Sequence, residues 1–201
     1  MINKTIEELN KMFGRLNKQI FEDKLELPII LVQTAGRRKN VLGWCTTRKI
    51  WEDKKGENGK YEITICAESL NREPLEIMET TLHEMVHLNN LINNVRDCST
   101  DGNYHNKQFK LTAEKAGLVV RKDDSHGYAF TSLSDQLRES LKDFPVDKSA
   151  FEYFRTRGIK IPVKVPSYRY ICDCGHKFTL GKEISIICGD CKKEFAVQEN
   201  V

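Results

Sequence analysis

The stretch "TTLHEMVHLNNLINN", residues Thr80–Asn94, places two histidines four residues apart inside an apolar run with helical spacing. Four residues of an α-helix turn through about 400°, so His83 and His87 project from one face, one turn apart. Glu84 lies beside that face. The pattern H-E-x-x-H on a helix is typical of a metal site in which two imidazoles share one ion and the glutamate acts as a general base.

A third ligand must come from elsewhere, because catalytic zinc sites usually have three protein ligands. His105 is favoured, since the polar segment 96–104 lets the chain reverse and brings the start of the next helix beside the first. His126 and Glu114 are the alternatives for this position.

Three imidazoles beside a carboxylate base, with no redox partner, indicate zinc. Such a site acidifies a water to a pKa of about 7, and Glu84 then accepts its proton as the water attacks a carbonyl. We therefore expect peptide-bond hydrolysis, with His83, His87 and His105 as ligands of a catalytic zinc and Glu84 as the base. The competing interpretation is a buried structural helix whose histidines are satisfied by hydrogen bonds.

The flanking sequence predicts helices packed on a short sheet, an α+β fold. A first amphipathic helix starts near an N-cap at Thr5, with Glu8 as its capping-box partner. The runs "LPIILVQT", "VLGWCTT" and "YEITICA" predict a sheet of about three strands. Pro74 opens the histidine helix, and a third helix runs from about residue 106 to residue 115. Residues 118–148 are ambiguous, with a further helix possible in "SLSDQLRESLKDF".

Four of the seven cysteines fall within twenty residues near the end of the chain. They form C-x-C, thirteen residues, then C-x-x-C, the spacing of a zinc ribbon with a closed structural site. The predicted ligands of this second zinc are Cys172, Cys174, Cys188 and Cys191. His176 is left as a surface group, because four sulfurs already complete the tetrahedron.

Residues 155–193 hold nine Lys or Arg against three acidic residues. Cations interleaved with aromatic rings are suited to phosphates and unpaired bases, so DNA, including single-stranded DNA, is an expected partner. A solvated basic face is the competing interpretation. The candidate nucleic-acid contacts are Arg169, Tyr170, Lys177, Lys182, Lys192 and Lys193.

Length and composition allow one core and a small appendage: 201 residues, 39% hydrophobic and 30% charged. We expect a catalytic domain over residues 1–154, a linker over 155–167 and a ribbon over 168–201. The longest apolar run is too short to cross a bilayer, and no secretory signal is visible, so a cytoplasmic location is expected. We also expect a monomer that does not bind a membrane.

These features together resemble the SprT-like family of zinc metallopeptidases, which includes the Spartan-type proteases that cleave DNA–protein crosslinks. "LNKQIFEDKL", "HEMVH", "DGNYHNKQF" and the paired cysteines carry the resemblance. Asn106 departs from the glycine that often follows the third histidine in that family. The resemblance implies a zincin-like catalytic domain followed by a ribbon, with a protein substrate on or near DNA. The rival from another class is a non-enzymatic nucleic-acid-binding or transcription accessory protein in which both zinc ions are structural.

Overall fold

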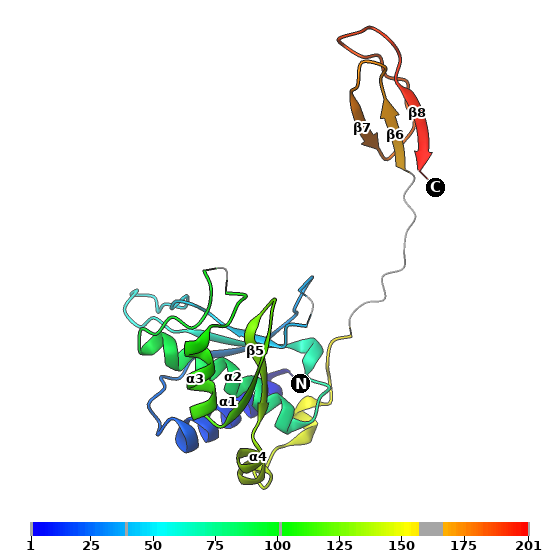
Figure 1. The fold of residues 1–201 in the computed structure, drawn as a ribbon. Helices are drawn as coiled ribbons and strands as arrows, with labels where there is room; N and C mark the ends of the chain where they lie inside the picture. Colours follow the sequence, from blue (N-terminus) through cyan, green and yellow to red (C-terminus); the bar gives the residue numbers. More distant parts are fainter. Residues whose placement is uncertain (1, 39, 101, 157–166, 201) are drawn as a thin grey trace. The chain divides into compact units, whose positions relative to one another are not determined.

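The computed structural model of this chain describes residues 2–38, 40–100, 102–156 and 167–200. The chain divides into two compact units, Met1–Arg157 and Gly158–Val201, and each is described by itself (Figure 1). Most of the linker expected at 155–167 lies outside the described residues. The elements of the first unit are α1 (Ile2–Ile20), β1 (Ile29–Gln33), β2 (Gly43–Cys45), β3 (Glu62–Cys66), η1 (Ala67–Ser69), α2 (Pro74–Ile92), α3 (Lys107–Lys115), β4 (Leu118–Asp123), β5 (Gly127–Leu133), α4 (Asp135–Leu141) and η2 (Lys148–Phe151).

Helix α2 is the histidine helix, and it begins at Pro74 as the sequence predicts. Glu73 and Glu76 form a capping box at its start, in which each side chain accepts a hydrogen bond from the other residue's backbone. Asn93 caps the other end. The helix contacts α1, α3, β2, β3 and β5, so it is enclosed by the rest of the unit. Side chains on most of its circumference are therefore buried.

The predicted three-stranded sheet is present, in the order β1–β3–β2. The central strand β3 runs parallel to β1 and antiparallel to β2, and all its residues are buried. In the register of the antiparallel pair, Gly43 lies opposite Ile65 and Cys45 lies opposite Ile63. This order leaves β2 as an edge strand that packs against α2.

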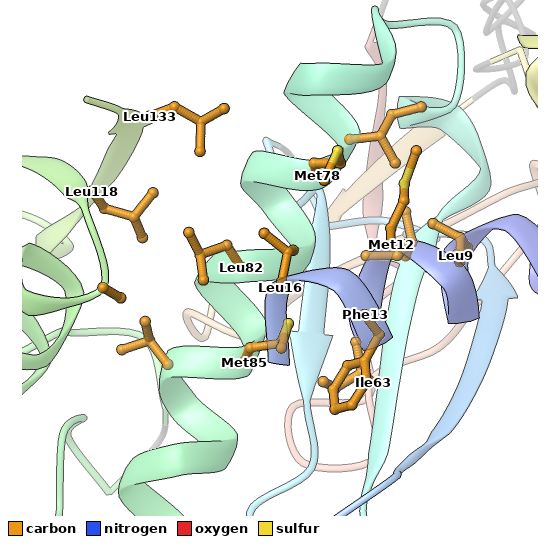
Figure 2. Close-up of a cluster of buried hydrophobic side chains, with 14 of the residues drawn as sticks. Leu9, Met12, Phe13, Leu16, Ile63, Met78, Leu82, Met85, Leu118 and Leu133 are labelled. Atoms are coloured by element: carbon orange, nitrogen blue, oxygen red, sulfur yellow. The ribbon is translucent and has the colours of Figure 1, made fainter. Parts of the chain in front are cut away.

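Residues 118–148, which the sequence leaves ambiguous, form a β-hairpin followed by the short helix α4. Strands β4 and β5 pair antiparallel, with Leu118 opposite Leu133. Figure 2 shows Leu118 and Leu133 on one side of α2, and Leu9, Met12 and Phe13 of α1 on its other side. Burying each such side chain contributes about 1.5–3 kcal/mol. Because α2 is packed from both sides, its histidine face has a fixed position.

The N-cap predicted at Thr5 is wrong, because helix α1 already includes Ile2. Thr5 is buried inside the helix, and its hydroxyl donates to the carbonyl of Ala150 at 2.6 Å. Glu8 is also buried and accepts from the backbone N–H of Asp147 at 3.2 Å. These two side chains therefore connect α1 to the η2 segment, a tertiary contact that helix-capping rules do not reveal.

The second unit holds β6 (Ser167–Ile171), β7 (Lys177–Leu180) and β8 (Ala196–Asn200), in the order β7–β6–β8 with antiparallel pairing. Tyr170 of the central strand stacks on Phe178, with ring centroids 4.9 Å apart and planes 6° from parallel. The buried core of this unit consists, within the described residues, of Tyr170, Cys172, Cys188 and Phe195, with a few partly buried apolar side chains packed against them. Such a core is too small to hold three strands together without a further constraint.

Among the described helices, none combines the length and apolar character that crossing a membrane requires.

Candidate metal centres

His83 and His87 stand on one face of α2, as their spacing predicts, with ring centroids 5.1 Å apart. His105 reaches them from the segment before α3. The N–H of His105 donates to the carbonyl of His126 at 2.9 Å, and the N–H of Tyr128 donates to the carbonyl of His105 at 3.0 Å. The turn of the β4–β5 hairpin and the first residues of β5 therefore hold the backbone of His105 in place.

The Nε2 atoms of the three imidazoles converge on one point. Nε2 of His105 lies 3.2 Å from Nε2 of His83 and 3.1 Å from Nε2 of His87. Nitrogens bound to one tetrahedral zinc at 2.0–2.1 Å lie about 3.3–3.4 Å from one another. The three side chains thus fit a shared zinc ion with shifts of a few tenths of an ångström, and they form a candidate cation site.

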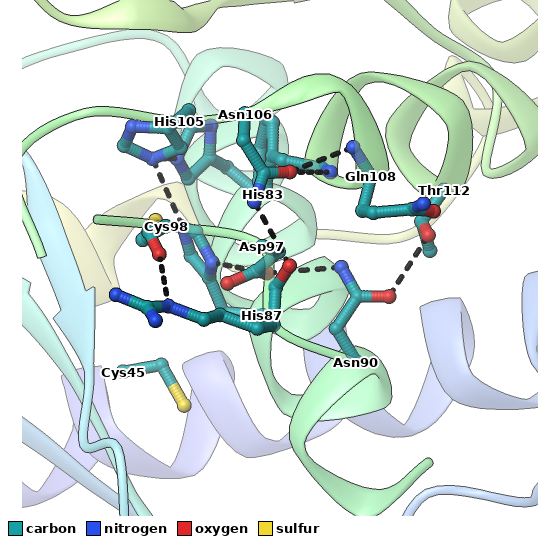
Figure 3. Close-up of polar contacts among 12 residues, drawn as sticks. Cys45, His83, His87, Asn90, Asp97, Cys98, His105, Asn106, Gln108 and Thr112 are labelled. Carbon is teal, nitrogen blue, oxygen red and sulfur yellow. Dashed lines mark hydrogen bonds and ion pairs between the residues drawn. The ribbon is translucent and has the colours of Figure 1, made fainter. Parts of the chain in front are cut away.

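The outer nitrogens of two of these rings have hydrogen-bond partners. Nδ1 of His87 lies 2.7 Å from the carboxylate of Asp97 (Figure 3), and Nδ1 of His83 lies 3.0 Å from the hydroxyl of Thr131. A carboxylate only accepts, so Nδ1 of His87 carries the proton and its Nε2 presents a lone pair. Nδ1 of His105 is buried and has no well-aligned hydrogen-bond partner among the described residues, although backbone groups of His126 and Asn103 lie close enough to offset part of the lowering of the ring's pKa by burial.

The electrostatics of the cluster favour neutral rings at two positions. Burial, together with the charges of its two neighbouring histidines, holds the pKa of His83 well below its usual value. Burial and the charge of His87 lower the pKa of His105 to about 4. Burial acts in the same direction on His87, but the hydrogen bond to Asp97 and the charge of Glu84 outweigh it and raise the pKa of His87. Neutral His83 and His105 can donate lone pairs to a cation at neutral pH.

Phe109 of α3 forms the floor beneath the three imidazoles. Its ring centroid lies 4.7 Å from those of His83 and His87 and 4.6 Å from that of His105. The side chain is fully buried. One apolar ring therefore closes the inner side of the cluster and limits the access of water from that side.

Glu84 is buried, with 5% of its surface exposed. Burial raises the pKa of its carboxyl to about 7, although the charge of His87 and the backbone N–H of Cys45 act in the opposite direction. The edge strand approaches this carboxylate closely at Gly43. A Cβ there would lie 3.3 Å from Oε1 of Glu84 and 2.8 Å from the carbonyl of Thr64, so the close approach requires glycine.

The two alternatives for the third ligand lie apart from the cluster. His126 is exposed, and its Nδ1 faces the carboxylate of Asp123 at 3.3 Å. Glu114 is exposed on α3 and pairs with Lys110 at 2.9 Å. Of the three candidates, only His105 is brought to His83 and His87.

Replacing Gly127 with alanine is expected to weaken cation binding at the histidines and to destabilise the first unit. Gly127 has φ of +66°, and a Cβ there would lie 2.1 Å from the carbonyl oxygen of His105. The backbone conformation alone costs alanine about 1 kcal/mol or more. The clash adds to this cost, because the chain that carries His105 must move. Urea unfolding and retention of added zinc measure the two effects.

Gly36→Ala is the matched control, because Gly36 has φ of +62° and a Cβ added to it would meet nothing within 4 Å. It carries the conformational penalty without the clash. We expect Gly36→Ala to leave zinc retention unchanged. Equal losses of stability and of zinc in the two variants would contradict the role given to Gly127.

The four predicted cysteines of the second unit also come together. Sγ of Cys172 lies 3.2 Å from those of Cys174 and Cys191, and Sγ of Cys174 lies 3.5 Å from that of Cys188. A tetrahedral zinc with Zn–S of 2.3 Å separates its sulfurs by about 3.8 Å. The sulfurs need to spread by a few tenths of an ångström to enclose the ion, so this cluster is a second candidate metal site.

The two cysteine pairs sit in turns of the same design. The N–H of Cys172 donates to the carbonyl of His176, and the N–H of Cys188 donates to the carbonyl of Lys193. The residue after the second cysteine of each pair has positive φ, at +98° for Gly175 and +62° for Lys192. Backbone N–H groups of Cys191 and Asp190 point at Cys188 and lower its pKa to about 6, which favours the thiolate that a metal requires. The backbone N–H of Cys174 acts in the same direction on Cys172, but hydrogen bonds to neighbouring sulfurs and burial outweigh it and raise the pKa of Cys172 to about 12. In the metal-free cluster the thiolate is therefore favoured at Cys188 and not at Cys172.

One predicted nucleic-acid contact is contradicted by the structure. Tyr170 is fully buried, and its hydroxyl accepts from the N–H of Ile184 at 2.7 Å, so its ring is not available to stack on a base. Alternating strand positions explain the error, because Tyr170 faces the core while Arg169 faces the opposite side. Lys177 lies on the same exposed side as Arg169. It is paired with Ile171, which is two residues after Arg169 and therefore faces the same way.

The remaining predicted contacts, Lys182, Lys192 and Lys193, are all exposed. Lys193 pairs with Asp173 at 3.0 Å, and Lys192 donates to the carbonyl of Gly189 at 2.6 Å. Both cations are thus already engaged with groups of their own unit. His176 is exposed as expected, and its Nε2 lies 2.6 Å from the carboxylate of Asp190.

Sequence reasoning missed Asp97 and Thr131, which contact the outer nitrogens of His87 and His83, and Asn90, which contacts Asp97. Asp97 lies in a polar loop, and Asn90, one turn after His87 on α2, donates to it at 2.9 Å. That spacing is the signal that could have identified Asn90. Thr131 gave no such signal, because its strand was not predicted.

Comparison with known proteins gives one finding. The model of the SprT-like family matches residues 9–150, which contain all three histidines and Glu84. Searches of curated proteins and of solved structures returned no significant match.

Proposed function

Because the chain belongs to the SprT-like family, we propose that it is a zinc-dependent metalloprotease with a zincin-like catalytic unit, acting on DNA-bound or crosslinked proteins. The observation that carries this proposal is the convergence of three Nε2 atoms, at 3.1 and 3.2 Å, next to a buried glutamate. Histidines that serve packing alone would direct their ring nitrogens to separate hydrogen-bond partners.

In this proposal His83, His87 and His105 hold the ion through Nε2 and leave one tetrahedral position open. Zinc, when bound there, would polarise a peptide carbonyl and acidify water. Glu84 would take the proton of the attacking water and pass it to the departing amine. A carboxyl group whose pKa burial raises to about 7 suits transfer in both directions at neutral pH.

The edge strand β2 supports the proposal of a peptide substrate. Leu42 and Thr46 use backbone groups to bond to β3, because Leu42 accepts from Cys66 and Thr46 donates to Glu62. In an antiparallel pair the intervening residues, Gly43 and Cys45, direct their backbone groups outward. The N–H of Cys45 is directed at the carboxylate of Glu84, so a peptide would pair with the backbone groups of Gly43 and the carbonyl of Cys45. An extended peptide could pair with that edge, beside Glu84.

The second unit supports the proposal of DNA association. Arg169 and Lys177 lie on the exposed face of its sheet, opposite the aromatic core. In this proposal the four cysteines hold a structural zinc, and the basic face contacts phosphates. A phosphate-binding face would leave base stacking to other groups, since Tyr170 is buried.

The test is cleavage of an unfolded protein substrate by the full chain, with and without single-stranded DNA. We expect cleavage that 1,10-phenanthroline abolishes, that added zinc restores and that DNA accelerates. The paired charge reversal Arg169→Glu and Lys177→Glu should remove the acceleration and leave the DNA-free rate unchanged, because both residues lie in the second unit.

The other outcomes separate the rival functions. A cleavage rate that is the same with and without DNA, at low and at high salt, would indicate a general peptidase. A protein that binds two zinc ions but cleaves nothing under any of these conditions would indicate a non-enzymatic binding module, and the proposed activity would be wrong.

A further inference from the structure

A chain of hydrogen bonds leads away from His87 into the protein (Figure 3). Nδ1 of His87 donates to Asp97 at 2.7 Å, and Nδ2 of Asn90 donates to the same carboxylate oxygen at 2.9 Å. Oδ1 of Asn90 in turn accepts from the hydroxyl of Thr112 at 2.8 Å. The chain thus joins α2, the loop after it and α3.

This chain of hydrogen bonds allows a single arrangement of protons. Asp97 as a carboxylate can only accept, so both His87 and Asn90 must donate to it. The amide of Asn90 is thereby oriented with its oxygen toward Thr112, whose hydroxyl must donate. The carboxylate fixes every proton in the chain, including the one on Nδ1 of His87.

Burial makes each of these bonds expensive to lose. Asn90 is 1% exposed and Asp97 is 8% exposed. Leaving a buried polar group without its partner costs about 1–3 kcal/mol, and more for a charged group. The backbone of Asp97 is held as well, because its carbonyl accepts from the N–H of Asn106 at 2.8 Å. The carboxylate of Asp97 therefore has a fixed position relative to Asn106, the residue next to His105.

Asp97 contacts the side of the His87 ring that faces away from the cluster. Its oxygen is on Nδ1, whereas Nε2 of the same ring lies 3.1 Å from His105. The carboxylate can act on a cation at the cluster only through the imidazole. Carboxylates in this position fix the tautomer and orientation of a metal-ligating histidine and increase its basicity.

We propose that Asp97 is a positioning residue of the candidate zinc site, which holds the Nε2 lone pair of His87 toward the ion, and that Asn90 and Thr112 hold its carboxylate. The inference rests on the proposed metal site. It adds the residues that determine how tightly the chain binds the ion. Removing such a contact typically weakens metal affinity by about 10- to 100-fold.

The test is titration of the full-length, metal-free protein with cobalt(II), followed by optical spectroscopy. Cobalt bound to thiolates gives intense sulfur-to-metal charge-transfer bands, whereas cobalt at three histidines gives only weak visible bands, so the two sites are distinguished in one sample. For Asp97→Asn we expect about 10- to 100-fold weaker binding at the histidine site and unchanged binding at the cysteines. The matched variant Thr112→Val, at the far end of the hydrogen-bond chain, should lose less affinity than Asp97→Asn, because it leaves the carboxylate on His87 in place. Asp97→Glu should recover part of the loss, because it restores the charge.

A second measurement needs no variant. Long-range proton–nitrogen NMR spectra of the metal-free wild-type chain report which nitrogen of His87 is protonated, and we expect Nδ1. At a pH at which the ring is neutral, a proton on Nε2 in place of Nδ1 would overturn the role of Asp97 while leaving the metal site intact. Equal cobalt affinity in wild type and Asp97→Asn would do the same. A wild-type protein that binds cobalt only at its cysteines would overturn both the inference and the proposed function.

Discussion

Glu84→Gln is expected to lower the rate of protein cleavage by about 10²- to 10⁴-fold, the usual contribution of a positioned general base. Glutamine has nearly the same size and can still accept the hydrogen bond from the N–H of Cys45 that Glu84 receives. It has no basic oxygen that can accept a proton from water. The loss should therefore appear in kcat, whereas zinc content should stay at two ions per chain, because Glu84 is not among the side chains that form either candidate site.

The measurement is single-turnover cleavage of one protein substrate by both proteins, with zinc counted by native mass spectrometry. The control is Glu114→Gln, an exposed glutamate on α3 that should leave the rate unchanged. A Glu84→Gln variant with full activity would reject the glutamate as base. Zinc content and folding are measured on the same samples. If Glu84→Gln has also lost its zinc, Glu84→Asp is the second variant, because its carboxylate is one methylene group shorter. A zinc-loaded Glu84→Asp with the wild-type cleavage rate would reject a positioned base at residue 84.

Cys188→Ser is expected to unfold the second unit and leave the first unit folded. The buried core of the second unit amounts, within the described residues, to Tyr170, Cys172, Cys188 and Phe195, and two of these are cysteines of the cluster. The structural zinc of comparable small modules contributes about 10–16 kcal/mol of apparent binding free energy, far more than so small a core can supply. The loss of one thiolate therefore removes most of what holds β6, β7 and β8 together.

Two-dimensional NMR measures this outcome, since the resonances of the second unit should collapse to unfolded positions while those of the first unit remain dispersed. His176→Ala is the control: His176 lies near Cys188 but is exposed and pairs with Asp190. It should retain the second zinc ion and the folded spectrum. A folded Cys188→Ser variant that has lost its zinc would show that the aromatic core is sufficient by itself.

The parts of the fold that the sequence predicts are those with a strong local signal. Helix α2 combines a proline start with a long apolar run, and the i, i+4 spacing of His83 and His87 follows from helix geometry alone. The three β-prone runs form the sheet as expected. A polar loop that allows the chain to reverse predicts His105 as the third ligand, and the structure brings His105 to the pair.

The parts that were missed depend on contacts between distant residues. Strands β4 and β5 carry charges and polar groups such as Arg121 and Asp123, so their alternation is weak, and their pairing is decided by packing on α2 and α3. Thr5 was misread because a buried threonine bonded to Ala150 has the same local sequence as a helix cap. Tyr170 was misread because composition reveals an aromatic residue but not the face of the sheet on which it lies.

The hairpin β4–β5 contacts two histidines that belong to different parts of the chain. Thr131 meets the ring of His83, and His126 and Tyr128 bind the backbone of His105. Two-stranded hairpins are only marginally stable alone, so this one persists by docking on the rest of the unit. Its local unfolding equilibrium and the assembly of the imidazole cluster are consequently one linked process. A cation that binds all three rings shifts that equilibrium toward the docked hairpin by mass action. Conversely, a partner protein that binds the undocked hairpin separates His105 from His83 and His87 without contacting any of the three rings.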